Sequence, residues 1–271
     1  MTASAPPLQD RVVALFGGGG RLAPFLTRRL LDAGAAVALV DASAEGLARV
    51  AGQLAGAARV AAFTADVTDE AAVSVALQAL LARFGRLDRF VWAVNAALPG
   101  SLDSMPVESW RRTLEVHLTG YFLCLRAALE PLRRAGGAVV NIASVYGVVS
   151  PDPRTYADPA QGTPLAYAAA KGGLIAMTRY LAVYLAPWNI RVNSVSPGGI
   201  AAGQDPAFLA ALCRAGPAAA HGRPVGGGRR GGLPARRRVG SRHGPKPDRR
   251  RRPDRVVRRG YSRPSMRRAF R

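Results

Sequence analysis

The sequence is poor in cysteine. The two cysteines among its 271 residues, Cys124 and Cys213, do not have the spacing of a metal site. Two isolated thiols exclude the disulfide framework of a small secreted domain and argue against a zinc centre. The first residues, MTASAPPLQDR, also lack the apolar run of a signal peptide. We therefore expect no metal and a reducing, cytoplasmic location.

Long hydrophobic runs are absent as well. No uncharged apolar run reaches the roughly 18 residues that a membrane span needs, so no membrane partner is expected. Hydrophobic residues nevertheless make up 49% of the chain, which is enough for a sizeable core. The length fits one large α/β domain or two small ones, and no internal repeat is visible.

Acidic residues are scarce in the last part of the chain. Residues 214–271 contain 20 of the 38 Lys and Arg residues but 2 of the 17 Asp and Glu residues. Residues 1–213 therefore carry a net charge of +3, although the whole chain carries +21. The basic character belongs to a tail, not to the body of the protein.

Short apolar segments alternate with helical patterns through the first two hundred residues. We expect helices over 106–135 and 165–186, with Pro187 ending the second, and Ser43 and Thr68 as N-caps of two earlier helices. Apolar strands that alternate with helices predict a doubly wound parallel sheet of Rossmann type, in a single domain, with its ligand crevice at the carboxyl ends of the strands. The expected strands are 11–16, 35–42, 59–67, 87–97 and 137–144, and 190–199 is expected to hold a sixth strand and its turn.

A glycine cluster, GGGG at 17–20, follows the first strand and precedes a helix. Glycines allow backbone N–H groups to approach a pyrophosphate at a helix N-terminus. Asp41 ends the second strand, where a carboxylate accepts hydrogen bonds from an adenosine ribose, so NAD is favoured over NADP. A plain strand–helix turn followed by a capping Asp is the alternative. The cluster, the strand order and the acid together favour dinucleotide binding.

Tyr167 and Lys171 are four residues apart in YAAAK, which places both side chains on one face of a helix. A phenol with a pKa of about 10 is a poor acid or base near neutrality. A nearby ammonium is expected to lower that pKa and make the phenol a usable acid/base for a carbonyl or alcohol oxygen. Ser144, at the carboxyl end of a strand, is placed to bond the same oxygen. An amphipathic helix with a half-buried Tyr and a solvated Lys is the alternative.

Over roughly residues 8–212 the chain resembles the short-chain dehydrogenase/reductases. The resemblance rests on ADVTD (65–69), VNIASVYG (140–147), YAAAKGGLIAMTRYLA (167–182) and NIRVNSVSPGG (189–199). It implies NAD(P)-dependent hydride transfer between a nicotinamide and a small-molecule carbonyl or secondary alcohol.

The resemblance also implies roles for single residues. Tyr167 would be the acid/base, Lys171 would bind the nicotinamide ribose and tune Tyr167, Ser144 would orient the substrate carbonyl, and His117 would stand at the position of an active-site Asn. The implied cofactor contacts are Gly17, Gly18, Gly20, Leu22, Asp41, Asp66, Val67, Asn95, Tyr167, Lys171, Pro197, Gly198 and Ile200.

Several positions depart from the family pattern. TGxxxGxG would place Thr at 16 and Gly at 21 and 23, but the chain has Phe16, Arg21 and Ala23. Arg21 either crowds the pyrophosphate or pairs with it. His117, in VHLTG, either holds a proton-relay water or is a packed helix histidine. Both questions stay open at the level of sequence.

Ser144 and Tyr167 are 23 positions apart, more than in most members of the family. The additional residues, 150–163, are rich in Pro, Asp and Gly and are expected to form a loop over the substrate crevice. Tyr156 has the more usual spacing from Ser144, but the residue four later is Ala160. Without a lysine there, Tyr156 is rejected as the acid/base.

The tail over 213–271 has no counterpart in the family and reads as disordered. Read one base later, suitable codons for 242–252 yield VTGQNPIVDGG, which resembles the family's last strand. A shifted frame beginning between about Asp205 and Gly216 therefore explains the arginines. Such a chain would lose its final helix and strand and part of a family-like homodimer or homotetramer interface, and we expect it to be unstable or poorly soluble.

Three functional hypotheses follow. The leading one is an active NAD(P)-dependent oxidoreductase. A catalytically impaired relative with the same fold is the second. The third is a nucleic-acid binder that acts through the basic tail, although the tail lacks interleaved aromatic residues. The substrate cannot be derived from the fold.

Overall fold

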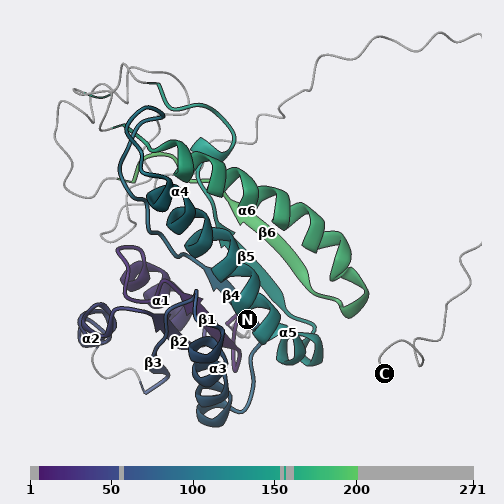
Figure 1. The fold of residues 1–271 in the computed structure, drawn as a ribbon. Helices are drawn as coiled ribbons and strands as arrows, with labels where there is room; N and C mark the ends of the chain where they lie inside the picture. Colours follow the sequence, from purple (N-terminus) through teal and green to yellow (C-terminus); the bar gives the residue numbers. More distant parts are fainter. Residues whose placement is uncertain (1–5, 55–57, 153–155, 157–161, 201–271) are drawn as a thin grey trace, which may run out of the picture. The chain divides into compact units, whose positions relative to one another are not determined.

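The computed structural model describes residues 6–54, 58–152, 156 and 162–200. Its centre is a six-stranded sheet in which every neighbouring pair of strands is parallel, in the order β3-β2-β1-β4-β5-β6 (Figure 1). This confirms the predicted doubly wound sheet. The strands are β1 (Val12–Phe16), β2 (Ala36–Asp41), β3 (Val60–Thr64), β4 (Arg89–Trp92), β5 (Ala138–Ile142) and β6 (Arg191–Val195).

Strand β1 lies at the point where the strand order reverses. Val13 is paired with Val37 of β2 on one side and with Arg89 of β4 on the other. All five residues of β1 are buried, because the strand has neighbours at both edges and helices on both faces. In sheets of this kind ligands bind outside the carboxyl ends of the strands at such a point.

Helices cover the two faces of the sheet unequally. Residues of α1 and α2 pack with Val13 and Leu15 on one face, and residues of α3, α5 and α6 pack with Val12, Ala14 and Phe16 on the other. The main helices are α1 (Ala23–Asp32), α2 (Ala44–Gly52), α3 (Glu70–Phe84), α4 (Val107–Leu114), α5 (Gly120–Ala135) and α6 (Leu165–Tyr184).

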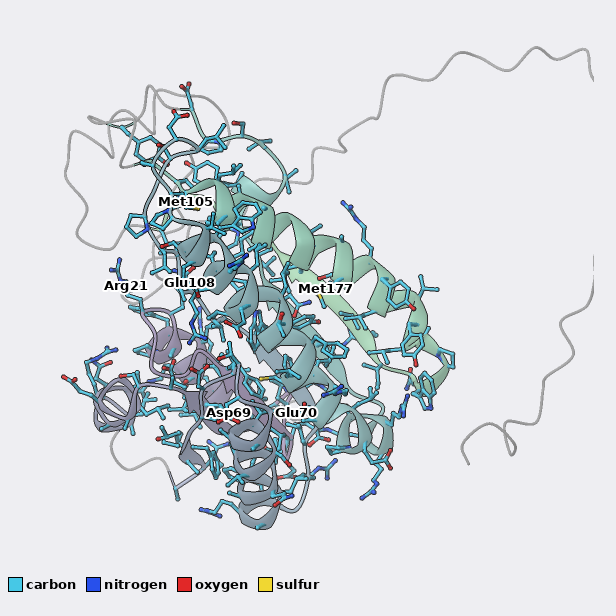
Figure 2. All side chains as sticks on the ribbon, viewed as in Figure 1. Arg21, Asp69, Glu70, Met105, Glu108 and Met177 are labelled. Carbon is cyan, nitrogen blue, oxygen red and sulfur yellow. The ribbon has the colours of Figure 1, made fainter. Side chains whose placement is uncertain are left out.

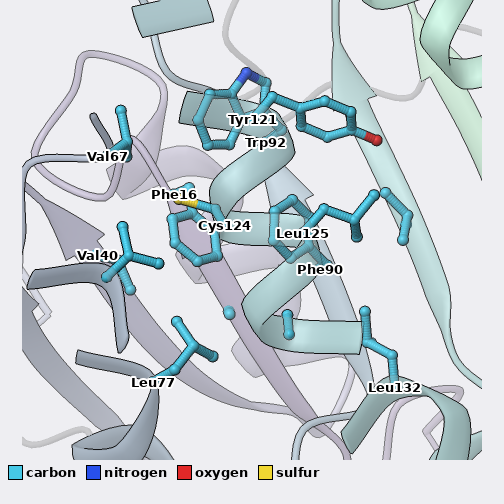
Figure 3. Packing of buried hydrophobic residues seen from close by; sticks show 14 of the residues in the cluster. Phe16, Val40, Val67, Leu77, Phe90, Trp92, Tyr121, Cys124, Leu125 and Leu132 are labelled. Carbon is cyan, nitrogen blue, oxygen red and sulfur yellow. The ribbon is translucent and has the colours of Figure 1, made fainter. Parts of the chain in front are cut away.

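Aromatic rings fill the larger core cluster (Figure 3). The rings of Phe16 and Phe90 stack with centroids 4.7 Å apart, and Trp92 and Tyr121 meet edge to face at 5.4 Å. Phe16 is fully buried in this cluster. Phe16 stands where the family pattern has Thr. Its side chain points into the core cluster on one face of the sheet, as do those of Val12 and Ala14, and it does not line the ligand cleft.

The expected helix over 106–135 exists but is not uniform. Its central residues Glu115–Thr119 form a π-helical turn, η1, between α4 and α5. Turns of this kind often mark functional positions in a helix. His117 lies in the middle of this one.

The predicted N-caps give one confirmation and one correction. Ser43 accepts a hydrogen bond from the backbone N–H of Gly46, as expected. Thr68 does not cap the helix that follows it. Asp69 is the N-cap and accepts from Ala71 and Ala72, because the Thr68 hydroxyl already donates to Asp66.

Two expected strands are longer than the observed ones. Strand β3 ends at Thr64 and β4 at Trp92, although apolar residues continue in both cases. The residues beyond these ends leave the sheet and line a cleft. The tail over 213–271 and its shifted frame lie outside the described residues, as does part of the loop over 150–163. In the described ranges, no helix combines the length and apolar character that crossing a membrane requires.

Candidate active site

A cleft of about 700 Å³ opens at the carboxyl ends of the central strands. It brings together nearly all the residues proposed from the sequence; Gly18 and His117 are not in its lining. The lining residues are Gly17, Gly20, Arg21, Leu22, Asp41, Ala42, Ala65, Asp66, Val67, Ala93, Val94, Asn95, Ala96, Arg112, Val116, Ile142, Ala143, Ser144, Tyr167, Lys171, Pro197, Gly198 and Ile200.

The glycine turn forms one wall of this cleft. Gly17 has φ of +82°, and a Cβ there would meet the carbonyl carbon of Ala93 at 2.6 Å, so no other residue fits. Gly18 faces away from the cleft. Its N–H donates to Val40, and a Cβ would approach the backbone of β2 to 2.8 Å. Gly18 therefore allows the turn to pack on β2 and does not contact the cleft.

The start of α1 has free donors for an anion. Its N-cap position, Leu22, makes no side-chain capping bond. Within the described part of the chain, the backbone N–H groups of Arg21 and Leu22 find no acceptor. Arg21 adds an exposed cation at the same turn (Figure 2). Unpaired N–H groups at a helix N-terminus suit a phosphate, so the residues fit the pyrophosphate of a dinucleotide.

Asp41 lines the cleft at the carboxyl end of β2. Its carboxylate accepts hydrogen bonds from Gly19 N–H at 3.0 Å and Ser43 N–H at 2.9 Å. These two bonds fix the orientation of the carboxylate and tie it to the glycine turn. Each oxygen still has a free lone pair for a further donor such as a ribose hydroxyl.

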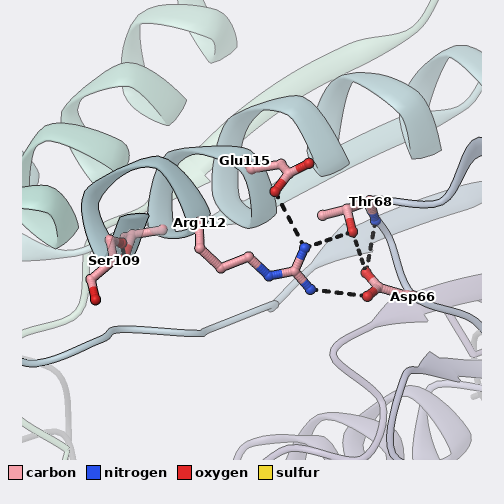
Figure 4. Close-up of polar contacts among 6 residues, drawn as sticks. Asp66, Thr68, Ser109, Arg112 and Glu115 are labelled. Atoms are coloured by element: carbon pink, nitrogen blue, oxygen red, sulfur yellow. Dashed lines mark hydrogen bonds and ion pairs between the residues drawn. The ribbon is translucent and has the colours of Figure 1, made fainter. Parts of the chain in front are cut away.

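Asp66 lies at the far side of the cleft in a network of polar contacts (Figure 4). One carboxylate oxygen accepts from the backbone and the side chain of Thr68, and the other accepts from Arg112 Nη2 at 3.0 Å. Arg112 also donates to Thr68 and Glu115. Burial raises the pKa of Asp66, but these bonds outweigh burial and hold the pKa below its ordinary value.

Lys171 lies at the other end of the cleft and is 3% exposed. Its Nζ donates to the carbonyl of Ile142 at 3.0 Å and, more weakly, to that of Val94 at 3.4 Å. Burial lowers the pKa of Lys171 to about 8, because the charged form loses hydration. One carbonyl belongs to the last residue of β5 and the other to the segment that follows β4, so the ammonium joins these two parts of the chain at the site.

Tyr167 and Ser144 face the cleft beside Lys171. Burial raises the pKa of the Tyr167 phenol above its ordinary value, and a hydrogen bond with Ser144 opposes this effect. The expected net lowering of this pKa is not found for the chain by itself, because burial outweighs the opposing effects. Its Nζ lies 5.5 Å from the centroid of the phenol ring and bonds to backbone carbonyls instead. Tyr167 therefore holds its proton near neutrality.

His117 lies behind this wall and is fully buried. Its Nε2 accepts a hydrogen bond from Ala96 N–H at 3.2 Å, and its ring meets the ring of Tyr167 edge to face at 5.9 Å. Burial, together with the charge of Lys171, lowers the pKa of His117 to about 3, so the imidazole is neutral. These contacts are those of a packed residue that touches both the β4 end and Tyr167.

The structure separates Tyr167 from Tyr156. The hydroxyl of Tyr156 contacts Thr163 Oγ1 at 2.7 Å, and Tyr156 is not a lining residue of the cleft. Sequence reasoning missed Arg112, since nothing in the sequence links it to a partner 46 residues away. It also missed a second recess that adjoins the cleft at Ser144 and Tyr167.

The sequence profile of a family described as enoyl-(acyl carrier protein) reductase matches residues 22–211. This match covers more than half of the chain; it begins directly after the glycine turn and includes the Tyr167–Lys171 helix. The chain belongs to the short-chain dehydrogenase/reductase family. It is therefore an oxidoreductase that uses a nicotinamide dinucleotide to interconvert an alcohol and a carbonyl compound.

Individual relatives agree with this assignment. The chain is 38% identical to levodione reductase of Leifsonia aquatica over 210 residues, which are 74% of each protein. It is 42% identical to trans-4-hydroxycyclohexanecarboxylate dehydrogenase of Sinomonas cyclohexanicum over 135 residues, half of this chain and 48% of that protein. The crystal structure of an NAD+-bound xylitol dehydrogenase superposes with a TM-score of 0.64 at 29% identity and covers 76% of this chain and 75% of that one.

Proposed function

We propose that this member of the family is an NAD-preferring dehydrogenase or reductase of a small secondary alcohol or ketone, with Tyr167 as its acid/base. One observation carries the proposal. Ser144, Tyr167 and Lys171 meet at one end of a cleft whose other wall is a glycine turn, and the start of α1 after this turn has free N–H donors. Bound nicotinamide supplies or accepts the hydride, and the remaining steps belong to the residues of the chain.

Tyr167 moves the proton in this proposal. In the reductive direction its hydroxyl donates to the substrate oxygen, and in the oxidative direction the phenolate accepts the proton from the alcohol. Ser144 bonds the same oxygen and orients it. The ammonium of Lys171 stabilises the phenolate as it forms, which requires the charged form and hence a pH below about 8 in the free protein.

The cofactor contacts proposed from the resemblance are supported by their position in the cleft. Asp41 favours NAD, because its carboxylate suits the ribose hydroxyls of NAD and repels the 2′-phosphate of NADP. Arg21 is proposed to pair with the pyrophosphate that the N–H groups at the start of α1 receive. The other proposed contacts are Gly17, Gly20, Leu22, Asp66, Val67, Asn95, Pro197, Gly198 and Ile200.

His117 is proposed to position other groups and not to carry a proton. Its neutral imidazole accepts from Ala96 N–H and packs on Tyr167, and it is absent from the lining of the cleft. A group with a pKa of about 3 holds no proton at neutral pH that it can pass on. The packed-histidine alternative from the sequence is therefore preferred.

The C-terminal part of the proposal concerns 201–271. We retain a catalytic domain over 8–212, a tail over 213–271 that results from a shifted frame, and a family-like dimer or tetramer for a chain with an unshifted C-terminus. On β6, Val195 is 51% exposed, which supports a missing cover on this part of the sheet. Resequencing of codons 200–220 tests this part: a missing or added base supports it, and an unchanged sequence refutes it.

The Tyr167→Phe variant tests the acid/base assignment. We expect turnover of cyclohexanol with NAD to fall by about 10³-fold, within the range for loss of general acid/base catalysis, while the Kd for NADH stays within about twofold. Tyr180→Phe is the matched control, because Tyr180 is on the same helix and 69% exposed. Equal turnover in the two variants would refute the assignment.

Cofactor preference is tested by the ratio of kcat/KM with NAD to kcat/KM with NADP. We expect the parent to prefer NAD and Asp41→Ser to lose most of that preference, because the repelling carboxylate is gone. A parent that prefers NADP would overturn the assignment to Asp41.

Two alternatives have distinct outcomes. An impaired relative would bind NADH but oxidise no alcohol even in the parent chain. A nucleic-acid binder would show salt-sensitive affinity for DNA or RNA that disappears when 214–271 is deleted.

A further inference from the structure

A smaller recess of about 280 Å³ opens beside the cleft. The two share Asn95, Ser144, Tyr167 and Gly198, so the recess begins at the groups proposed to hold the reacting oxygen. Because a water-sized group occupies about 30 Å³, the recess has room for a molecule of roughly ten heavy atoms. Its remaining lining residues are Ala97, Val145, Tyr146, Thr163, Pro164 and Gly199.

The lining of the recess is uncharged and combines apolar surface with several hydroxyl groups. Hydroxyl groups come from Tyr146 and Thr163 in addition to Ser144 and Tyr167. Among the described residues that line it, none is Lys, Arg, Asp or Glu. A carboxylate or phosphate in this place would lose its hydration without gaining a counter-charge, which is costly. The recess therefore suits a neutral molecule.

A row of three hydroxyl groups borders the recess. The hydroxyl of Tyr156 contacts Thr163 Oγ1 at 2.7 Å and donates to Tyr146 Oη across 3.5 Å. Tyr146 is an acceptor in this row, and its own O–H finds no acceptor among the described residues. Burial raises the pKa of Tyr146, so that this proton is retained near neutrality.

The position of Tyr146 is well defined. It lies in the short 3₁₀ turn η2 (Val145–Gly147), directly after Ser144, and its backbone N–H donates to Ser144 Oγ at 3.2 Å. Gly147 packs so closely on α6 that a Cβ would meet the carbonyl carbon of Lys171 at 2.7 Å. The turn is thus held against the helix that carries Tyr167, and the Tyr146 hydroxyl keeps a fixed relation to the reacting end.

We propose that Tyr146, supported by Tyr156 and Thr163, donates a hydrogen bond to a second oxygen of the substrate, so that the substrate is a small uncharged compound with a second oxygen function near the reacting carbon. This proposal rests on the proposed function, since it assigns the first oxygen to Ser144 and Tyr167. A donor whose proton has no other protein acceptor favours a substrate that supplies one, because a substrate without it leaves this half-buried donor unpaired in the occupied recess.

The test compares two neutral substrates that differ by one oxygen. The kcat/KM of the full-length protein with NAD is measured for vicinal cyclohexanediol, as its cis and trans isomers, and for cyclohexanol. We expect the diol to be preferred, and Tyr146→Phe to lower the diol-to-cyclohexanol ratio about tenfold, the order expected for one hydrogen bond. Damage to the fold or to the acid/base would lower both values together and would leave the ratio unchanged.

Matched variants complete the experiment. Tyr180→Phe, on the exposed side of α6, should leave the ratio as in the parent. Thr163→Val should lower it less than Tyr146→Phe does, because Thr163 acts partly through Tyr156. A parent without preference for the diol, or a ratio that Tyr146→Phe does not move, overturns the proposal.

Failure of the proposed function has a separate signature. A parent that oxidises neither compound refutes the proposed function, and the diol-to-cyclohexanol ratio is then taken from dissociation constants of the complexes with protein and NADH, measured by calorimetry. Tighter binding of the diol that Tyr146→Phe abolishes would support the second-oxygen contact without turnover. Equal binding of the two compounds would overturn it.

Discussion

Buried charged groups at the two ends of the same sheet differ in how completely they are paired. At the amino end, before β1 and β4, the side chain of Asp88 is fully buried and every oxygen is occupied. It accepts two bonds from Arg86, at 2.6 and 2.8 Å, one from Arg11 at 3.0 Å and one from Val12 N–H at 2.9 Å. Burial raises the pKa of Asp88, but these bonds outweigh it and hold the pKa below its ordinary value.

At the carboxyl end, charged and polar groups are buried with fewer partners. Lys171 is nearly inaccessible and contacts two carbonyls, but among the described residues it has no carboxylate partner. His117 Nδ1 is buried without a hydrogen-bond partner in the described ranges. The charged groups at the amino end are fully paired and stabilise the sheet. At the carboxyl end, buried polar groups keep unpaired hydrogen-bonding positions, which are available for the proposed chemistry.

The largest effect is expected at the carboxyl end. Lys171→Met should lower turnover about 10²- to 10⁴-fold, because the phenolate of Tyr167 loses the nearby cation that stabilises it. Steady-state kinetics with saturating NAD at pH 7 measures this. A loss of less than threefold would show that Lys171 is a structural residue.

The stability of the same variant should depend on pH in a defined direction. The pKa of Lys171 is lowered in the folded chain from 10.5 to about 8, so the folded state binds fewer protons than the unfolded state between these values. The stability of the parent should therefore rise with pH across this window, and Lys171→Met should lack that rise. Urea unfolding of both proteins at pH 7 and pH 10 provides the comparison, and parallel pH dependence would contradict it.

The amino end should respond in stability and not in chemistry. Asp88→Asn should lower the free energy of unfolding by about 3 kcal/mol, the low end for one lost partner of a buried ion pair, because Arg11 and Arg86 are 41% and 47% exposed and can be rehydrated. Turnover per folded molecule should not change. Glu130→Gln, which breaks an exposed pair with Arg134, is the control and should cost less than about 1 kcal/mol. Equal losses in the two variants would remove the contrast between the ends.

A smaller effect is expected where Arg112 holds Asp66. Arg112→Gln should raise the Kd for NADH about tenfold while kcat stays within about twofold, because Asp66 loses the charged partner that orients it. Fluorescence titration with NADH measures the affinity. Arg111→Gln, a neighbour on the same helix that is exposed, removes the same charge without touching Asp66. An equal loss of affinity in both would indicate a general charge effect.

The smallest effect is expected for His117→Asn. An amide oxygen replaces Nε2 as acceptor for Ala96 N–H, so kcat should stay within about threefold, whereas His117→Leu removes the acceptor and should cost about tenfold. The pH–rate profile between pH 5 and 8 should be the same in the parent and in His117→Asn, because an imidazole with a pKa of about 3 does not titrate there. A pKa that vanishes from the profile would restore His117 as a proton relay.

Much of the fold was predictable because its signals are local. Apolar strands between helical patterns predicted the six strands, and Ser43 was identified as a cap from the sequence around it. Thr68 was misassigned because its hydroxyl has a competing partner in Asp66, which a capping rule does not take into account. Strands β3 and β4 were predicted too long, since apolar residues that line a cleft look the same as apolar residues in a sheet.

Site residues, too, were predictable where the signal is local and were missed where it depends on packing. Gly17, Asp41 and Lys171 could be placed together at the cleft from the sequence, because glycine turns, strand-end acids and i, i+4 pairs are short-range patterns; their roles stay predictions. The direction of the pKa shift of Tyr167 was wrong, because burial and the distance to Lys171 are properties of the packed molecule. Arg112 and Tyr146 were missed for the same reason.

By itself the sequence determined the alternation of strands and helices, the turn at which Gly17 is required, and the shared helical face of Tyr167 and Lys171. Each of these follows from steric and periodic rules that act within a few residues. Tertiary structure alone decided that Ser144 meets Tyr167 across 23 positions and that Arg112 reaches Asp66 across 46. It also decided the solvent exposure of Lys171 and His117. Such contacts depend on which helix packs on which strand, and desolvation depends on all the atoms around a group at once.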